Sequence, residues 1–148
     1  MDILNCTNDD VKEIKKIEDK SFSGAWSEKA IEEEMNEPTA FCVSAREEGI
    51  LAGYAFLSVL PPEAELLRIA VAPEKRGRGT ADILMKSLFF EAKKRGIETV
   101  FLEVREDNAP ARRLYEKHGF TRYGVRKKYY EGTFDAVLYK KEMRERSK

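Results

Sequence analysis

A glycine-rich turn between a predicted strand and a predicted helix constrains this chain more than any other feature. The turn consists of Arg76, Gly77, Arg78, Gly79, Thr80 and Ala81. It follows the apolar segment 66–71 and precedes a segment with helical spacing that runs to Arg95. Such a turn leaves backbone N–H groups free at the positive end of a helix, which binds phosphate-like anions. Two arginines add positive charge, so the turn predicts a ligand that carries a pyrophosphate.

Two common phosphate-binding motifs do not fit this turn. A P-loop ends in Gly-Lys-Ser/Thr, whereas here Thr80 and Ala81 follow Gly79. The dinucleotide fingerprint needs a small residue three positions after its second glycine, where this chain has Asp82, whose charge would repel a pyrophosphate. What remains is the pattern Arg-x-x-Gly-x-Ala, which begins at Arg76. A basic surface turn without a ligand has a similar sequence and stays open as an alternative.

Length and charge limit the class of protein. A chain of 148 residues fits one domain, which we expect over residues 1–143, followed by a charged C-terminal tail over 144–148. Its 27 basic and 27 acidic side chains give zero net charge, whereas non-specific nucleic-acid binding usually requires a basic chain. No apolar run approaches the ~20 residues that span a bilayer, and the first residues lack a signal segment. We therefore expect a cytoplasmic protein with no membrane partner and no direct nucleic-acid partner.

The cysteines and the histidine do not indicate a metal site. Cys6 and Cys42 are the two cysteines, and His118 is the one histidine, with no metal-ligand spacing among them. Both cysteines stand in short apolar stretches, which favours buried structural thiols over a reactive pair with His118. We therefore expect no metal.

Periodic apolar patterns predict seven strands and about four helices. The predicted strands span residues 3–6, 40–45, 51–60, 65–71, 99–104, 120–125 and 134–139. The predicted helices begin after Thr7 or Asn8, after Ser27, after the glycine-rich turn and after Asn108. The long helix joins strand 65–71 to strand 99–104, which makes this pair parallel, while the other connections favour antiparallel pairs. The prediction is an α/β fold with one mixed, mostly antiparallel seven-stranded sheet.

A second motif lies about thirty residues after the turn. It consists of Asn108, Ala111, Tyr115, Gly119 and Phe120. In this order and at this distance, the two motifs resemble the acyl-CoA pyrophosphate loop and a following helix of the GNAT N-acetyltransferase superfamily. The resemblance implies a single-domain GNAT fold whose parallel strands, about 65–71 and 99–104, splay apart. It also implies acetyl-CoA as the cosubstrate.

Further segments narrow the resemblance to the bacterial RimI-type enzymes, which acetylate the amino-terminal alanine of ribosomal protein S18. These segments are 25–29, 69–71, 102–105, 114–116 and 126–130, and the resemblance covers nearly the whole chain. Two departures concern the acceptor side. The family often has Phe-Pro-Trp at the position of residues 23–26, and it often has Asn at the position of Arg68. The resemblance therefore identifies the reaction, acetyl transfer from acetyl-CoA, more securely than it identifies the molecule that accepts the acetyl group.

Direct attack of an amine on a thioester requires a base for the amine and an acid for the leaving thiolate. An α-amino group, with a pKa of about 8, loses its proton more easily than a lysine amine at about 10.4. The family places its base at Glu103, on the strand face opposite Leu102 and Val104, although a solvated strand-end charge is the alternative. The family places its acid at Tyr115, for which packing in the core is the alternative.

The resemblance also implies which residues hold the cosubstrate and the acceptor. Backbone N–H groups of the splayed strand would stabilise the oxyanion. The expected cofactor-binding residues are Ile69, Ala70, Val71, Arg76, Gly77, Arg78, Gly79, Thr80, Ala81, Asn108 and Tyr115. The acceptor groove is expected between loop 22–26 and hairpin 129–134. Its candidate residues are Trp26, Tyr129, Tyr130 and Glu131, for which aromatic packing at a loop is an equal alternative. The cluster Arg122, Arg126, Lys127 and Lys128 is expected to be a solvated strand face, with contact to an acidic partner or to ribosome-bound RNA as the alternative.

The sequence predicts an enzyme that moves acetyl from acetyl-CoA to the α-amine of a protein amino terminus. Ribosomal protein S18 or a similar N-terminus is the expected acceptor, and the expected state is a monomer or weak dimer. One alternative is the same fold acting on a small amine, such as a polyamine, or on a lysine side chain. Another is an acyl-CoA-binding sensor, which would need neither Glu103 nor Tyr115.

Overall fold

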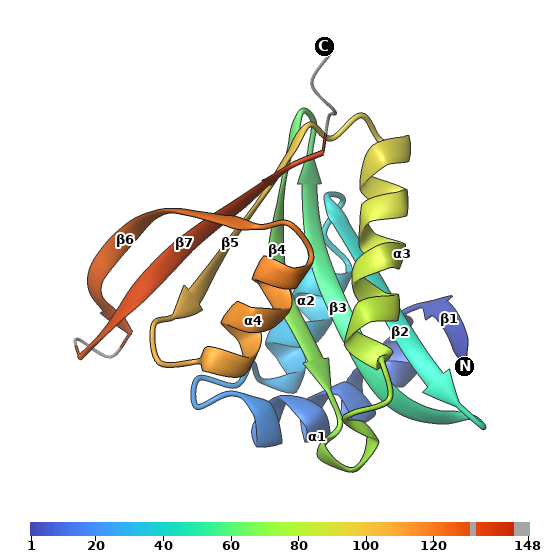
Figure 1. Ribbon diagram of the computed structural model, residues 1–148. Helices are drawn as coiled ribbons and strands as arrows, with labels where there is room; N and C mark the ends of the chain where they lie inside the picture. Colours follow the sequence, from blue (N-terminus) through green and yellow to red (C-terminus); the bar gives the residue numbers. More distant parts are fainter. Residues whose placement is uncertain (131–132, 144–148) are drawn as a thin grey trace.

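Seven strands form one sheet in the order β1-β2-β3-β4-β5-β7-β6 (Figure 1). The computed structural model describes residues 1–130 and 133–143, without the side chains of Tyr129 and Tyr130. The strands are β1 (Asp2–Asn5), β2 (Ala40–Glu47), β3 (Ile50–Leu60), β4 (Glu63–Val71), β5 (Thr99–Arg105), β6 (Thr121–Tyr130) and β7 (Phe134–Glu142). Strands β4 and β5 pair in parallel, and the other neighbouring pairs are antiparallel.

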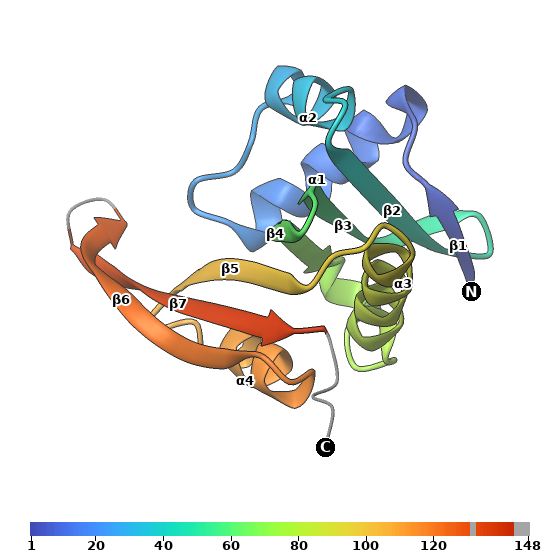
Figure 2. The ribbon, with the colours of Figure 1, turned by 90° about the horizontal axis from the view of Figure 1, so that it is seen from above.

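Two helices cover each face of the sheet, which gives a three-layer molecule (Figure 2). The helices are α1 (Val11–Ser21), α2 (Glu28–Met35), α3 (Thr80–Lys94) and α4 (Ala109–Lys117). Helices α1 and α2 pack over one core, and α3 and α4 over a second core on the other face. Each helix has an apolar stripe that it buries against the sheet, and this burial is the main stabilising contribution.

The glycine-rich turn places α3 closely against the sheet. Gly79 precedes the helix with a φ of 78°, a conformation that favours glycine. Across the interface, a Cβ on Gly53 of β3 would lie 3.3 Å from Thr80 Cγ2 and 2.8 Å from the carbonyl oxygen of Ala70. The missing side chain at Gly53 therefore lets the start of α3 approach β3 and β4.

Strands β4 and β5 separate soon after they meet. Their pairing runs over three positions and ends where Glu65 lies beside Phe101. Beyond that point β4 carries a bulge, because Leu66 and Arg68 pair with consecutive residues of β3 while Leu67 has no counterpart there. The rest of β5 pairs with β7 instead. An opening therefore forms between the two strands, and the edge of β4 beyond Glu65 has no strand partner on this side.

The predicted architecture is confirmed in its main features. The structure has the seven strands, the four helices, the mixed sheet and the parallel crossover, with strand ends displaced by a few residues. Strand β6 starts at Thr121 rather than at Phe120 and continues to Tyr130. The predicted turn at Glu131 and the predicted tail 144–148 lie outside the described residues. Within the described ranges, none of the helices has the length and apolar character needed to cross a bilayer.

Candidate active site

A cavity of about 450 Å³ lies at the opening between β4 and β5. Its walls come from the loop after α1, from β4 and β5, and from α4 and the segment before it. The lining residues are Ser21, Phe22, Ser23, Gly24, Leu66, Leu67, Arg68, Ile69, Glu103, Val104, Arg105, Asp107, Asn108 and Tyr115. The fold therefore brings both predicted catalytic residues, Glu103 and Tyr115, into one cavity with the loop expected to face the acceptor.

Glu103 lies on the strand face that the sequence predicted. Burial alternates along β5, with Leu102 and Val104 buried on one face and Glu103 half-buried on the other. Its Oε1 accepts a hydrogen bond from Nη2 of Arg126 at 2.6 Å. Its Oε2 has no hydrogen-bond partner among the described residues. One oxygen therefore fixes the carboxylate, and the other can accept a proton.

The basic cluster on β6 is exposed, as expected, but one of its members, Arg126, also makes a contact that the sequence did not predict. Arg126 lies on β6, and its side chain contacts Glu103 of β5 by passing over the intervening strand β7. The residue of β7 that pairs with Arg126 is Ala136, whose side chain is small. Arg122 and Lys128 of the same cluster are exposed, as expected. No spacing in the sequence indicates a contact that passes over an intervening strand, so sequence reasoning missed it.

Tyr115 is held by aromatic packing at the other side of the cavity. It is 9% exposed, and its ring lies 5.9 Å from that of Phe120 and 6.3 Å from that of Tyr139. Tyr115 both packs in the core and lines the cavity, so core packing does not exclude the predicted acid role, which stays a prediction. A phenol in a fixed position beside a cavity can donate a proton or a hydrogen bond to a leaving group.

Asn108 caps α4, as predicted. Its side-chain oxygen accepts a hydrogen bond from the N–H of Ala111 at 3.2 Å, which satisfies one donor of the first helical turn. Asn108 also lines the cavity, so capping and contact with a ligand are compatible. On β4, Ile69 lines the same cavity beyond the point where pairing with β5 has ended. Backbone N–H groups at this edge can stabilise a developing oxyanion.

The turn before α3 has the geometry of an anion site. Gly77 and Gly79 both have positive φ, at 79° and 78°, and a Cβ on either would meet nothing within 4 Å. The approach to the backbone is therefore open at both positions. The first N–H groups of a helix have no intrahelical partner, so those at the start of α3 can bind phosphate oxygens. The residues present thus fit the pyrophosphate of acetyl-CoA.

The two arginines of the turn are held by different contacts. Arg76 donates from Nε to the carbonyl oxygen of Val71 at 3.2 Å, which ties the turn to the end of β4. Arg78 pairs with Glu47 of β2, which also contacts Lys75 at 3.3 Å. The hydrogen bond from Lys75 is the largest of the contacts that lower the pKa of Glu47. A phosphate would therefore compete with Glu47 for Arg78.

The side chain of Thr80 differs from the expectation of a cofactor ligand. Thr80 is 2% exposed, and its Oγ1 is enclosed without a hydrogen-bond partner among the described residues. Its methyl group faces Gly53 of β3. The backbone N–H of Thr80 remains at the helix start, so this residue can contribute to an anion site through its main chain.

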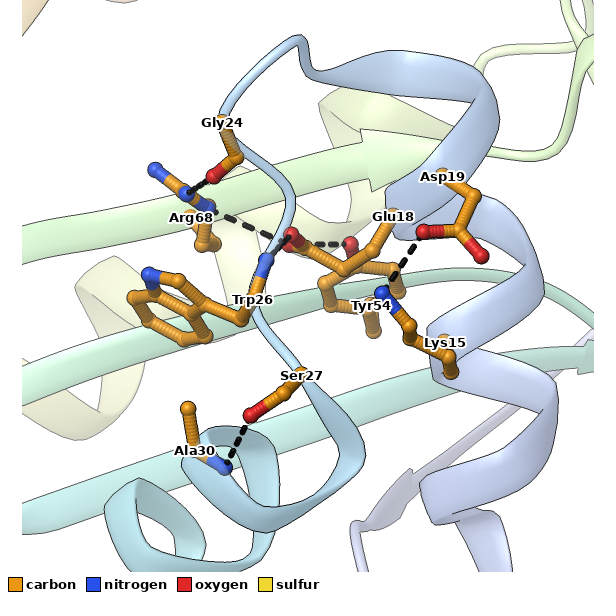
Figure 3. Close-up of polar contacts among 9 residues, drawn as sticks. All are labelled: Lys15, Glu18, Asp19, Gly24, Trp26, Ser27, Ala30, Tyr54 and Arg68. Atoms are coloured by element: carbon orange, nitrogen blue, oxygen red, sulfur yellow. Dashed lines mark hydrogen bonds and ion pairs between the residues drawn. The ribbon is translucent and has the colours of Figure 1, made fainter.

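The loop after α1 is organised by a buried carboxylate that the sequence reasoning did not single out (Figure 3). Glu18 is fully buried and accepts hydrogen bonds from Tyr54 Oη, from Arg68 Nε and from the backbone N–H of Trp26. Burial and the nearby Glu18 carboxylate raise the pKa of Tyr54, so the phenol stays protonated as a donor. The sequence did contain a sign that Glu18 is buried, because Glu18 stands four residues after Ile14 and therefore on the apolar stripe of α1.

Of the four residues predicted to bind the acceptor, the structure describes the side chain of Trp26 alone. Trp26 lies outside the lining of the cavity and packs edge-on against Phe56, with ring centroids 5.5 Å apart. The side chains of Tyr129 and Tyr130, and the whole of Glu131, lie outside the described residues.

The prediction of buried thiols is confirmed for Cys42 and holds in part for Cys6. Cys42 is buried and Cys6 is half-buried. Burial raises the pKa of both thiols, that of Cys42 to about 12, which makes them poor nucleophiles. His118 pairs instead with Asp82, at 2.7 Å, and joins α4 to the first turn of α3.

A second hollow of about 510 Å³ lies near β6, β7 and the start of α4. Its lining includes charges of both signs, among them Arg112, Arg122, Lys127 and Asp135. Neither Glu103 nor Tyr115 lines this hollow, whereas both predicted catalytic residues line the cavity between β4 and β5.

Comparisons with known proteins agree with this geometry. A family model described as the acetyltransferase (GNAT) family matches residues 11–120. The ribosomal protein bS18-alanine N-acetyltransferase of Escherichia coli is 35% identical over 125 residues, which cover 82% of this chain and 84% of the relative. The N-alpha-acetyltransferase RimI of Mycobacterium tuberculosis is 39% identical over 130 residues, which cover 84% of this chain and 80% of the relative.

Solved structures show the same fold. The crystal structure of the ribosomal-protein-S18-alanine N-acetyltransferase from Escherichia coli has a TM-score of 0.90 at 30% identity and covers 99% of this chain and 96% of that one. The structure of Ard1 from Thermoplasma volcanium has a TM-score of 0.89 at 24% identity, covers 97% of this chain and 98% of that one, and supports the fold alone. Together with the family model, these relatives show that the chain belongs to the acetyltransferase (GNAT) family and is an N-acetyltransferase related to the RimI-type enzymes.

Proposed function

We propose that the protein transfers acetyl from acetyl-CoA to the α-amine of a protein amino terminus, with an amino-terminal alanine of the bS18 type as the first candidate acceptor. The observation that carries the proposal is the cavity lined by both Glu103 and Tyr115 at the splayed strands. Relatives that span most of this chain are named as a ribosomal protein bS18-alanine N-acetyltransferase and as an N-alpha-acetyltransferase, which supports the same acceptor class. We place the reaction in the cytoplasm, where ribosomal proteins are made, and expect a monomer or weak dimer.

The cosubstrate is proposed to bind along the opening between β4 and β5. The turn 76–81 holds the pyrophosphate through backbone N–H groups, and the positive end of α3 adds to the attraction. The reactive thioester then reaches the cavity that Glu103 and Tyr115 line. Donors at the unpaired edge of β4, around residues 69–71, stabilise the negative charge that develops on the acetyl oxygen.

The proton transfers follow from the positions of the two side chains. Oε2 of Glu103 takes a proton from the α-ammonium group, directly or through one water molecule, and the neutral nitrogen attacks the carbonyl carbon of the thioester. The nitrogen of the tetrahedral intermediate loses its second proton to solvent, and the intermediate collapses with cleavage of the C–S bond. The hydroxyl of Tyr115 gives its proton to the departing thiolate, and solvent restores the phenol. The products are the N-acetylated terminus and CoA.

Release of CoA from acetyl-CoA in the presence of three matched peptides tests the proposal. One peptide begins with a free alanine, one has that amine blocked, and one is blocked but carries an internal lysine. The proposal predicts turnover with the free amino terminus only. Turnover with the lysine peptide would replace it with side-chain acetylation. Acetyl-CoA binding without turnover of any peptide would instead favour a small-amine acceptor or a sensor, and addition of a polyamine would separate those two.

A further inference from the structure

Arg68 is enclosed by the loop that borders the cavity (Figure 3). Its guanidinium lies over the ring of Phe22 at 4.4 Å and over that of Trp26 at 4.5 Å. Nη2 donates to the carbonyl oxygen of Gly24 at 3.1 Å, and Nε donates to Glu18 Oε1 at 3.2 Å. One side chain of β4 thus contacts the beginning, the middle and the end of loop 22–26.

Glu18 connects this loop to the rigid part of the fold. Its carboxylate is fully buried in α1 and accepts from Tyr54 Oη at 2.7 Å and from the N–H of Trp26 at 2.9 Å. A buried carboxylate with several donors has a fixed orientation, since losing a donor leaves charge without compensation. Glu18 of α1 therefore fixes the position of the Arg68 guanidinium, and the planar face of that guanidinium packs against the loop.

The same loop forms part of the cavity that contains the catalytic pair. Phe22, Gly24 and Arg68 line this cavity together with Glu103 and Tyr115. Trp26 stands behind this wall, packed against Phe56. Displacement of the loop would therefore change the room for an acceptor, while the turn before α3, which is proposed to hold the cosubstrate, is built from other residues.

We propose that Arg68 is a positioning residue, which fixes loop 22–26 through Glu18, Phe22 and Trp26 as the acceptor wall of the cavity. The inference rests on the proposed function and deepens it, because it assigns part of the acceptor selectivity. An asparagine side chain has neither the length nor the planar cationic face needed to contact both rings and Glu18. The shape of the acceptor wall is therefore expected to depend on an arginine at position 68.

Three variants and one control test this role. Arg68→Asn removes all contacts, Arg68→Lys keeps a charge opposite Glu18 but loses the planar face, and Glu18→Gln weakens the anchor. Arg95→Gln is the matched control. Arg95 also lies over an aromatic ring, that of Phe41 at 5.1 Å, and pairs with Glu91 at 2.8 Å, but it does not line the cavity.

Trp26 provides a readout that does not depend on turnover, because it is the single tryptophan of the chain. Acrylamide quenching of its fluorescence reports how tightly the loop is packed. Arg68→Asn is expected to raise the quenching constant about twofold and to raise KM for the alanine peptide about tenfold, with KM for acetyl-CoA within about twofold of the wild type. Arg68→Lys and Glu18→Gln should give intermediate values, and Arg95→Gln should match the wild type.

Unchanged quenching and an unchanged peptide KM in Arg68→Asn would overturn the inference. An equal rise of both KM values, or the same changes in Arg95→Gln, would also overturn it, since either result would indicate general loss of structure. If Arg68→Asn does not fold, the quenching constant and the peptide KM of Arg68→Lys are compared with those of Arg95→Gln, and a rise in Arg68→Lys alone supports the inference. If the wild type acetylates none of the peptides, the proposed function fails, whereas the quenching series still decides whether Arg68 positions the loop.

Discussion

Glu103 on β5 and Arg126 on β6 form an ion pair with an N–O distance of 2.6 Å, although β7 lies between their strands. The contact uses Oε1 of the carboxylate and leaves Oε2 without a partner among the described residues. A carboxylate held in this way presents one oxygen in a fixed direction, which is what a general base requires.

Glu103→Gln is expected to lower activity most at low pH. Without a base, only the fraction of amine that is already neutral can react, and this fraction falls about tenfold per pH unit below an α-amine pKa of about 8. The loss in kcat/KM is predicted to be about 100-fold at pH 6.5 and less than about tenfold at pH 9. A pH–rate profile of wild type and variant checks this. An equal loss at every pH would show that Glu103 positions the acceptor and does not take its proton.

Tyr115→Phe should separate binding from chemistry. Phenylalanine keeps the ring that packs against Phe120 and Tyr139, so the site should keep its shape. The loss of the acidic hydroxyl is expected to lower kcat about 100-fold, with KM for acetyl-CoA within about twofold. Steady-state kinetics at saturating acetyl-CoA provides the measurement, and unchanged turnover would remove Tyr115 from the mechanism.

The two ends of α3 offer a matched test of the cosubstrate turn. Gly79 before the helix and Gly96 after it have φ values of 78° and 76°, and a Cβ on either would meet nothing within 4 Å. Alanine at each position should therefore cost a similar ~1 kcal/mol of folding free energy. Gly79→Ala should also raise KM for acetyl-CoA about tenfold, because the methyl group enters the path of the pyrophosphate. Similar KM values in the two variants would contradict a phosphate site at the turn.

Thr80→Val should stabilise the protein without weakening the cosubstrate site. The hydroxyl of Thr80 is buried without a partner among the described residues, and valine has nearly the same shape. Removal of an unsatisfied hydroxyl is expected to raise the free energy of unfolding by about 1 kcal/mol, which urea titration can measure. An unchanged KM for acetyl-CoA is expected as well. A loss of affinity would show that the hydroxyl turns toward the ligand.

The fold could be predicted because its signals are local. Alternation and helical spacing mark the strands and helices, and the crossover from β4 through α3 to β5 makes one pair parallel. The turn 76–81 and the position of Tyr115 follow from motifs with a fixed order. These signals depend on neighbouring residues, so one sequence suffices to recognise them.

The contacts that shape the acceptor side could not be predicted in the same way. Arg68 and Glu18 are 50 residues apart in sequence, and their contact depends on how α1 packs over β4. The two departures from the family pattern, at residues 23–26 and at Arg68, looked independent in the sequence. In the structure the guanidinium of Arg68 bonds to Gly24 within that segment, so the two departures belong to one arrangement.

The most direct test of the account is to locate the acetyl group on a peptide that offers both amines in one molecule. The peptide begins with a free alanine and carries an internal lysine, and fragmentation by mass spectrometry after reaction with acetyl-CoA identifies the modified nitrogen. The account predicts a single acetyl group on the α-nitrogen, with the lysine unmodified. Acetylation of the lysine while the terminus stays free would contradict it.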